Sequence, residues 1–561
     1  MNTIIMQNMS KYISALFFFI ALSGVVKSQD LKDNFYVKAL SQELNRNIER
    51  LHLPELSKPF LITYKLRNNY NYVIRAERGH ITSTVKEPSV SKTALVKLLV
   101  GDYHRNFDYM QYGGFPVTLP DEDNADEIRR ILWLETDRAY KNTAQQYNAT
   151  LAALKRVTVD EKELALDDIS KITPVVKDYG SVSPISFDRK KWEDILTELS
   201  RMFNGNPELT TTYCQLNFNN YEDYTVSSEG AFIRQPSQSV SFTAYANTTD
   251  EEGNNFNEGY AFYAKDIAEL PSVETLKNEI NKIIASIKNS KKAQKFEEAY
   301  LGPVLFTEEA VSGLLQNMFG NSLVTRRKSI MGYDYGNNDY EDKLGQKLVS
   351  TDLTVTALPK LASFNGKPTT GSFQVDDEGV VPPDSLVLIK NGILKSLLNG
   401  RTPTQKFPKS QGFIKSFGGR VLNPGVLKVS SASTIPSDSM KQRLIKIARE
   451  EGLPFAYIVN QRDYTNADLF RVDVKTGLET LVKDCRISNF NIRSLRRFAT
   501  ASNKQVLSNM PNMSIISPES LIINEVEIEK QNKTVKPKPT IVSNPLVDKK
   551  IAPSRGSKAK K

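Results

Sequence analysis

The chain has 561 residues, of which 40% are hydrophobic, 25% charged and 9% aromatic, and its formal net charge is +10. This composition is typical of a globular protein with two to four domains, and it excludes wholesale disorder and collagen-like repeats. The two cysteines, Cys214 and Cys485, are too few for a disulfide framework or a four-thiolate zinc site, and the sequence leaves open whether they pair.

The net charge is concentrated at the two ends of the chain. Residues 530–561 hold nine lysines, one arginine and one aspartate, a net charge of +9, and residues 1–28 add +2. The residues between them, 29–529, therefore carry a net charge of −1. Since a nucleic-acid-binding domain normally presents its positive charge on a folded face, we expect no nucleic-acid partner.

The first residues are typical of an export signal. Lys11 precedes an apolar run from Ile13 to Val26, and small residues suit a cleavage site between Ser28 and Gln29. The alternative is a membrane anchor, but a run of about 14 residues is shorter than the roughly 20 that a membrane-spanning helix needs. We therefore expect residues 1–28 to be a signal peptide and the mature protein to be periplasmic or extracellular.

The last residues, 530–561, are rich in Lys, Pro and Ser, which predicts a basic disordered tail. The tail could be a solvated linker, could contact an anionic surface, or could bind nucleic acid. The linker is preferred, and an anionic surface comes before nucleic acid, because an exported protein meets acidic lipids and polysaccharides first.

Residues 29–175 predict an N-terminal α+β domain. Apolar residues at a spacing of four predict an amphipathic helix over Asn34–Leu51 that covers a sheet. The segments Phe60–Leu66 and Tyr72–Ala76 predict two strands that are joined in a hairpin at Asn68-Asn69. Further strands are expected at Ile81–Val85 and Thr93–Tyr103, and a helix at Asp126–Val157 with Asp126 as its cap.

Residues 176–299 predict a central α+β domain, and residues 300–529 predict a larger β-rich domain. In the central part, helices are expected at Asp188–Phe203 and Ser272–Phe296, with antiparallel strands between them at Thr210–Phe218, Thr225–Arg234 and Ser239–Tyr245. In the C-terminal part, helices at Glu308–Leu315 and Asp438–Glu451 interrupt β-like segments at Leu353–Leu358, Ser385–Lys390, Val426–Val429, Phe455–Asn460 and Leu469–Val474. The expected fold class is α+β, with antiparallel sheets in the N-terminal region and a large, mostly antiparallel β domain at the C-terminus.

Four segments in order along the chain carry a resemblance to a known family. They are residues 132–141 (LWLETDRAYK), 300–306 (YLGPVLF), 376–380 (DDEGV), and 391–394 (NGIL) together with 401–404 (RTPT). Together they resemble the TldD/PmbA family of metallopeptidase-related proteins in its exported form, over roughly residues 34–528. The resemblance implies the same α+β architecture that the patterns predict.

The resemblance also implies a zinc motif that this chain has lost. In active members the helix after the GPVLF-like strand carries His-Glu-x-x-x-His, with two zinc-binding histidines and a glutamate that acts as general base. The matching positions here are Gln316, Asn317 and Asn321. Carboxamides are poor zinc ligands, and an amide cannot take a proton from water at neutral pH, so no catalytic residue is expected here. Positions five apart lie about 140° apart on a regular helix, so the family geometry needs a distortion, which Gly320 would permit.

Ligands from elsewhere in the chain are not expected to replace this motif. The three histidines, His52, His80 and His104, all lie in the N-terminal region. The third ligand of active members is a later cysteine, but the stretch that would align with it, residues 503–517, has none, and Cys485 precedes it. We therefore expect no metal and no cofactor in this chain, with zinc in a motif-bearing partner.

Two groups of polar residues have both a structural and a functional interpretation. The three amides at 316, 317 and 321 could be ordinary residues of a half-exposed helix, or they could still hydrogen-bond a peptide backbone. The acidic cluster Asp376-Asp377-Glu378 suggests calcium, but an exposed turn between strands is the preferred interpretation, because the other ligands of a calcium loop are missing.

Three hypotheses on function remain. The first is a non-catalytic partner subunit, which forms a heterodimer with a motif-bearing TldD-like paralogue and holds unfolded or extended peptides for proteolysis. The second is a stand-alone envelope protein that binds peptides or surfaces. The third is an active metallopeptidase with an unorthodox site.

Overall fold

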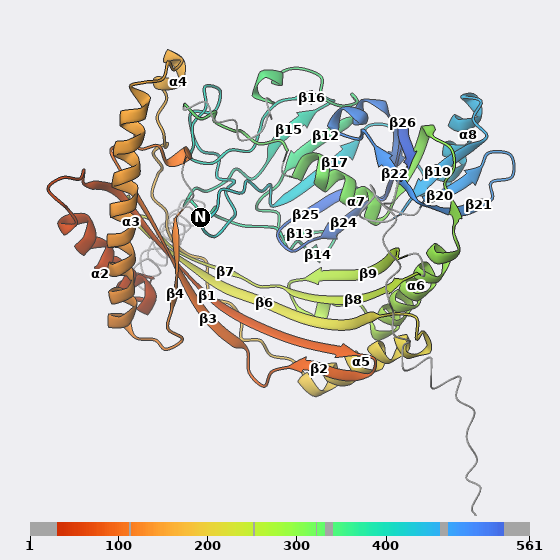
Figure 1. Cartoon of the computed structure of the whole chain (residues 1–561), viewed down its shortest axis with the longest axis horizontal. Helices are drawn as coiled ribbons and strands as arrows, with labels where there is room; N and C mark the ends of the chain where they lie inside the picture. Colours follow the sequence, from red (N-terminus) through yellow and green to blue (C-terminus); the bar gives the residue numbers. More distant parts are fainter. Residues whose placement is uncertain are drawn as a thin grey trace, which may run out of the picture.

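The structure, a computed structural model, describes residues 31–110, 114–250, 253–320, 322–330, 340–460 and 469–531. The predicted signal peptide and nearly all of the predicted basic tail lie outside these residues. A long curved sheet occupies one side of the molecule, and a C-terminal domain with two further sheets packs against it (Figure 1). Within the described residues, no helix combines the length and the apolar character that crossing a membrane requires.

The curved sheet is built on two long strands, β1 (Pro59–Glu77) and β6 (Thr211–Ser227), which pair antiparallel. The two predicted domains 29–175 and 176–299 contribute one of these strands each, so the predicted boundary at residue 175 runs through a single sheet. Its strand order is β4-β3-β1-β6-β7-β5, with β2 on β1 and with β8 and β9 continuing from β6. The other members are β2 (His80–Thr84), β3 (Ser89–Val100), β4 (Phe115–Leu119), β5 (Val176–Asp178), β7 (Phe232–Ser237), β8 (Val240–Thr249) and β9 (Asn255–Ala264).

The predicted hairpin at Asn68-Asn69 is wrong, because both residues lie inside β1. Asn68 pairs with Lys92 on one side and Glu222 on the other, so the ladder continues through the polar pair. The Asn68 side chain is buried and donates a hydrogen bond to the hydroxyl of Tyr70 at 2.6 Å. A buried amide with such a partner can stay in a strand. Similarly, the predicted strand Thr225–Arg234 is divided between the end of β6 and the start of β7.

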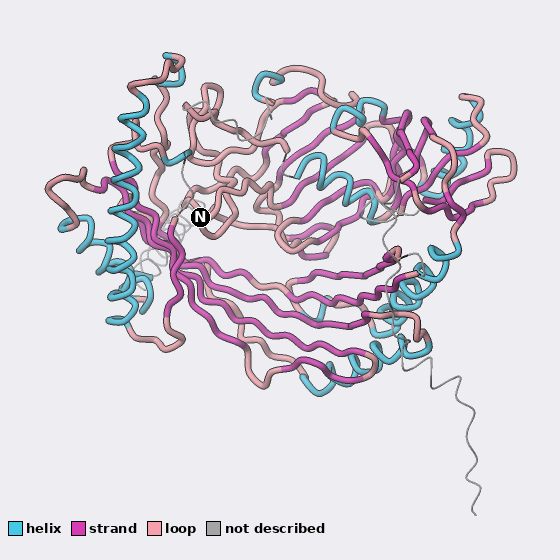
Figure 2. The backbone as a smooth tube through the Cα atoms, in the orientation of Figure 1, coloured by secondary structure: helices cyan, strands magenta, loops and turns pink. Residues whose placement is uncertain are grey.

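Alternate residues of β1 face opposite layers of the molecule, as the period of a strand requires. One set, which includes Tyr64 and Ile74, is buried under helices. The opposite set, which includes Thr63 and Lys65, faces the C-terminal domain. The helices gather at the two ends of the sheet (Figure 2). At one end lie α2 (Phe35–Arg50) and α3 (Ala125–Leu154), and at the other α5 (Arg189–Arg201) and α6 (Val273–Lys292).

Polar side chains cap these helices. Asn34, Asp188 and Ser272 accept backbone hydrogen bonds at the starts of α2, α5 and α6. The cap of α3 is Asn124 rather than the predicted Asp126, since Oδ1 of Asn124 accepts from the amides of Asp126 and Glu127 at 3.1 Å. Asp126 instead lies in the first turn, where the positive end of the helix dipole stabilises its carboxylate.

The C-terminal domain has two sheets that share one hydrophobic core with the short helix α7 (Glu309–Leu315). The first sheet has the order β10-β21-β20-β19-β11-β26-β23-β18, with β22 on β26, and the second has the order β16-β15-β12-β17-β25-β24. Helix α8 (Met440–Glu450) covers the other face of the first sheet. Most pairs are antiparallel, as predicted, but four pairs among the described strands are parallel: β10–β21, β11–β19, β17–β25 and β18–β23.

The bounds of the C-terminal strands agree closely with the predicted segments where those exist. The first sheet comprises β10 (Gln294–Lys295), β11 (Tyr300–Thr307), β18 (Thr434–Ile435), β19 (Phe455–Val459), β20 (Leu469–Asp473), β21 (Glu479–Lys483), β22 (Cys485–Ser488), β23 (Phe498–Ser502) and β26 (Ser520–Lys530). The second comprises β12 (Leu353–Ala357), β15 (Leu386–Lys390), β16 (Ile393–Leu394), β17 (Val426–Ser431), β24 (Gln505–Asn509) and β25 (Ser514–Pro518). A small hairpin joins β13 (Ser363–Phe364) to β14 (Lys367–Pro368).

The two cysteines lie in separate cores. Cys214 is buried on β6 beneath α5 and α6, and Cys485 is buried on β22 in the core of the C-terminal domain. The question that the sequence left open is thereby answered, since thiols in separate cores form no disulfide with each other.

Candidate functional site

The helix that carries the degenerate motif lies in the core of the C-terminal domain. It follows β11 directly, and Ala310, Val311 and Leu314 bury its apolar face between β11 and β25. The predicted helix at Glu308–Leu315 is confirmed within one residue. Tertiary packing stabilises this short helix, since seven residues are too few for a stable isolated helix.

A π-helical turn over Gln316–Gly320 continues α7. In a π turn the backbone hydrogen bonds join residues five apart rather than four, so positions i and i+5 move toward one face. The motif spacing requires such a distortion, and the structure contains it at the predicted place. The backbone of the motif is therefore retained up to Gly320, and Asn321 lies outside the described residues.

None of the side chains on this turn carries a charge. Gln316 is half-buried and Asn317 is exposed, whereas Met318 and Phe319 are buried in the core. The predicted positions 316 and 317 thus lie together on one turn and reach its accessible side. Whether these amides contact a peptide remains a prediction.

A loop between β24 and β25 packs against the π turn. A Cβ placed on Gly320 would lie 3.2 Å from Cε of Met513 and 3.6 Å from Cγ of Gln316. Met513 belongs to the stretch 503–517, where active members of the resembled family have their metal-binding cysteine. That stretch therefore does reach the motif helix in space, but it presents a thioether there.

The residues present do not fit a zinc ion. Structural and catalytic zinc sites use imidazole, thiolate or carboxylate ligands, whereas this place offers two carboxamides and a thioether. His52, His80 and His104 lie on the N-terminal part of the chain, as expected, with His80 on β2. Within the part of the chain that the structure describes, no three His, Cys, Asp or Glu side chains are placed to hold a metal ion.

Strand β24 lies at the edge of its sheet, and the turn that follows it reaches the π turn. Strand β24 is the last strand of its sheet and pairs with β25 alone among the described strands. Met510 donates a backbone hydrogen bond to Met513 at 2.9 Å, which closes the turn that follows β24. This turn carries Met513 to Gly320, so an extended peptide that paired with the edge would run toward the π turn.

The acidic cluster at 376–378 is buried, so the prediction of an exposed turn is wrong. Asp376 is 3% exposed, and its carboxylate accepts hydrogen bonds from the amides of Glu378 at 2.9 Å, Val380 at 2.8 Å and Ile414 at 3.2 Å. Burial and the neighbouring Glu378 raise the pKa of Asp376 to about 7. Because its oxygens accept these three backbone hydrogen bonds, the carboxylate stabilises its own loop and is not free to bind calcium.

The next acidic residue is held by a cation. Asp377 lies 2.8 Å from Nζ of Lys415. Burial alone would raise the pKa of Asp377, but Lys415 and Lys65 outweigh burial and lower it. The cluster faces the curved sheet, so these charges form part of the contact between the two parts of the molecule.

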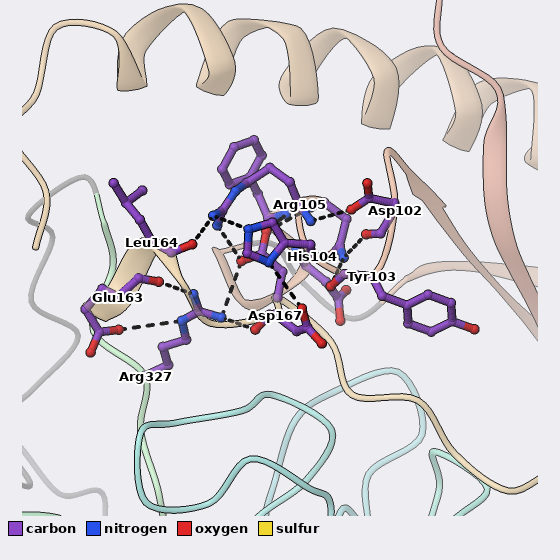
Figure 3. A network of polar contacts seen from close by, with 12 residues as sticks. Asp102, Tyr103, His104, Arg105, Glu163, Leu164, Asp167 and Arg327 are labelled. Carbon is purple, nitrogen blue, oxygen red and sulfur yellow. Dashed lines mark hydrogen bonds and ion pairs between the residues drawn. The ribbon is translucent and has the colours of Figure 1, made fainter. Parts of the chain in front are cut away.

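Arg327 ties the segment after the motif helix to the N-terminal part (Figure 3). Its side chain is 1% exposed, lies 3.3 Å from the carboxylate of Asp168 and stacks over the ring of Tyr109 at 4.2 Å. It also donates a hydrogen bond to the carbonyl of Asp167. Asp168 accepts from the amides of Asn106 and Phe107 at 2.8 Å each, so this buried carboxylate joins three segments.

His104 lies at the exposed rim of this network. Its Nδ1 is 3.2 Å from Asp167, and both side chains are about half exposed. The neighbouring Arg105 pairs with Asp168 at 3.1 Å and donates to the carbonyl of Leu164 at 2.7 Å. This placement gives His104 a structural role at the surface.

Comparison with protein families agrees with the motif and the architecture. Residues 299–440 match the model of the PmbA/TldA metallopeptidase C-terminal domain. This region holds the motif helix, the buried acidic loop and Arg401. The chain therefore carries the C-terminal domain of the TldD/PmbA family. The predicted resemblance is thereby confirmed. No curated protein matches the chain by sequence.

Solved structures share the fold of this TldD/PmbA-family chain at low identity. One is described as a candidate modulator of a DNA gyrase from Thermotoga maritima, with 14% identity, a TM-score of 0.56, and coverage of 89% of this chain and 100% of that chain. TldE from Thermococcus kodakarensis has 14% identity and a TM-score of 0.56, over 87% of this chain and 99% of that chain. A candidate modulator of DNA gyrase from Bacteroides thetaiotaomicron has 13% identity and a TM-score of 0.57, over 88% and 98%. These likenesses confirm the α+β fold class.

Sequence reasoning missed the charged interface between the two parts of this TldD/PmbA-family fold. A signal was present, because Lys65, Arg67 and Lys97 are charged residues inside otherwise apolar strands. Because these residues alternate with buried apolar ones, they predict that one face of the sheet packs against charged groups. Pairing them with the acidic loop at 376–378 requires the tertiary structure.

Proposed function

We propose that this chain is the non-catalytic subunit of a peptide-degrading pair, in which a motif-bearing TldD-like paralogue supplies the zinc. The π turn at Gln316–Gly320 carries this proposal, because it keeps the backbone distortion that the motif needs while its polar side chains are amides. Turns of π-helix are rare and are frequently found at functional sites, so the presence of one here favours a functional role for this helix.

The chain would contribute a surface for extended peptide. The edge of β24 offers backbone groups for strand addition, and Gln316 and Asn317 can both donate and accept hydrogen bonds where that edge ends. Neither amide can act as a general base at neutral pH. Proton transfer and activation of water therefore fall to the partner.

The proposal is tested by measuring cleavage of an unfolded polypeptide by the mature chain, by a motif-bearing paralogue from the same host, and by the two mixed. We expect the mixture to be active and the present chain alone to be inactive. Replacing the glutamate of the paralogue's motif should abolish activity of the mixture. Cleavage by the present chain alone, after removal of the partner, would contradict the proposal.

The stand-alone alternative makes a different prediction in the same experiment. A chain that binds labelled extended peptide, but neither associates with the paralogue nor changes its activity, would act as an envelope binding protein. The double variant Asn317→Leu with Gln316→Leu separates peptide binding from subunit association, because it removes the amides and leaves the remaining surface unchanged.

A further inference from the structure

A cavity of about 40 Å³ lies between the curved sheet and the loops of the C-terminal domain. Thr63 and Lys65 of β1 and Lys97 of β3 form one wall, and Ile414 lies on the opposite side. The charged side chains that line it are Lys65, Lys97, Asp377, Glu378, Arg401 and Arg420. This cavity is distinct from the π turn, and nothing in the proposed function makes use of it.

The loop that closes the cavity is held on the sheet by a stacked arginine. The guanidinium of Arg67 lies 3.8 Å from the ring of Tyr221 and 4.5 Å from the ring of Phe417. Arg67 also pairs with Asp223 at 2.7 Å through Nε. Phe417 precedes Gly418, Gly419 and Arg420, so this stack fixes the loop that brings Arg420 to the cavity.

The carboxylates around the cavity are already satisfied. Asp377 pairs with Lys415 at 2.8 Å, and Glu378 accepts from the backbone amide of Arg401 at 2.7 Å. The side chain of Arg401 binds Glu229 with two hydrogen bonds, at 2.7 and 2.8 Å. These partners leave the acidic residues little capacity for a further cation.

Two cationic side chains at the cavity, Arg420 and Lys65, are less fully paired than these carboxylates. Asp108 is shared by Lys97 at 3.0 Å and by Arg420 at 2.7 Å. Nε of Arg420 is buried and has no hydrogen-bond acceptor within the described residues. Burial lowers the pKa of Lys65, and the charges of nearby carboxylates, Asp377 first, oppose that effect. The cavity therefore has an unused donor, Nε of Arg420, and a lysine that lines the same space.

We propose that this cavity binds a single carboxylate group, held by Lys65 and by Nε of Arg420. By this measure of volume a water needs about 10–15 Å³, so 40 Å³ holds the few heavy atoms of a formate or acetate and nothing much larger. A carboxylate has two oxygens that can accept from two separate donors, and hydrogen bonds between charged groups are the strong ones. The carboxylate could come from a small free acid or from the C-terminus of a peptide.

Calorimetric titration of the full mature chain with sodium formate tests the site, in a buffer whose bulky sulfonate is too large for the cavity. We expect saturable binding with one site per chain. Lys65→Met should weaken it about tenfold or more, the range expected for a charged hydrogen bond. Lys190→Met is the matched control, because that lysine is 78% exposed and pairs with Asp194 on α5. Its affinity should be unchanged.

Arg420→Lys gives a second test that does not depend on Lys65. It retains a positive charge beside Asp108 but removes Nε, so formate affinity should fall while the chain keeps its fold. Formate binding that does not saturate, or an unchanged affinity in both variants, would overturn the proposal.

Competition identifies the source of the carboxylate. If the natural ligand is a peptide end, an extended peptide with a free C-terminus should displace formate and its C-terminal amide should not. If the natural ligand is a small acid, acetate should displace formate and neither peptide should. Both results support the site, and they leave the proposed subunit function untouched, since that function is tested by cleavage assays.

Discussion

The π turn at Gln316–Gly320 and the interface around the loop at 376–378 belong to the same family domain but differ in their chemistry. The π turn has a distorted backbone, and its accessible side chains, Gln316 and Asn317, are polar and uncharged. The interface is dense in charge, and its buried carboxylates are held by cations and backbone amides. The difference indicates that charge in this domain is concentrated at the contact between the two parts of the molecule and not at the π turn. This combination suits a subunit that shapes a binding surface.

Breaking the interface should have the largest effect. Arg401 is 5% exposed and binds both Glu229 and the carbonyl of Ser170. We expect Arg401→Met to lower the free energy of unfolding by about 3–5 kcal/mol, because it leaves the carboxylate of Glu229 buried and unpaired. Urea denaturation measures this. Arg138→Met is the control, since Arg138 pairs with Glu135 at the surface, and it should cost less than about 1 kcal/mol.

The buried carboxyl of Asp376 should make stability depend on pH. Its pKa is about 7 in the folded chain, above the ordinary aspartate value of 3.8, so between these values the folded state binds more protons than the unfolded state. Stability should therefore be greatest at low pH within this window and should fall as pH rises toward 7, by at most about 1.4 kcal/mol per pH unit. Asp376→Asn should flatten this dependence in urea titrations from pH 4.5 to 7.5. An unchanged slope would show that Asp376 is ionised throughout.

Substitution at the π turn should affect binding and leave stability nearly unchanged. Asn317 is exposed, so Asn317→Ala should change the free energy of unfolding by less than about 0.5 kcal/mol. If its amide hydrogen-bonds a peptide, affinity for a labelled extended peptide should fall by about 0.5–1.5 kcal/mol in binding free energy. Asn204→Ala, in the exposed 3-10 turn that follows α5, serves as the control. Equal affinities of both variants would argue against contact at position 317.

The exposed rim of the Arg327 network should contribute least. His104 and Asp167 are both about half exposed, so the pair is screened by water. We expect His104→Gln to change the free energy of unfolding by less than about 1 kcal/mol. A loss as large as that of Arg401→Met would show that the rim is as important as the buried interface.

Much of the fold followed from the sequence because apolar spacing sets which face of an element is buried. The helices over 34–51 and 308–315 and the need for a distorted motif helix were all predicted correctly. Local signals failed where tertiary contacts override them. Asn68-Asn69 has the composition of a turn, but pairing on both sides keeps it in a strand.

The acidic loop shows the same limit at the level of the site. Asp376 and Asp377 have the composition of an exposed turn, yet the sheet that covers them lies about 300 residues earlier in the chain. The sequence could mark the lysines of β1 and β3 as unusual, but it could not identify their partners. The motif positions 316 and 317, by contrast, followed from the resemblance to the family, because the motif lies on one helix after a recognisable strand.

Native mass spectrometry of the mature protein, gently isolated from its own host, tests the central claim most directly, since it reads subunit masses and bound metal together. We predict a heteromer in which a second, homologous chain with an intact motif carries the zinc. Zinc bound to the present chain alone would contradict it, because Gln316, Asn317 and Asn321 would then belong to a working metal site.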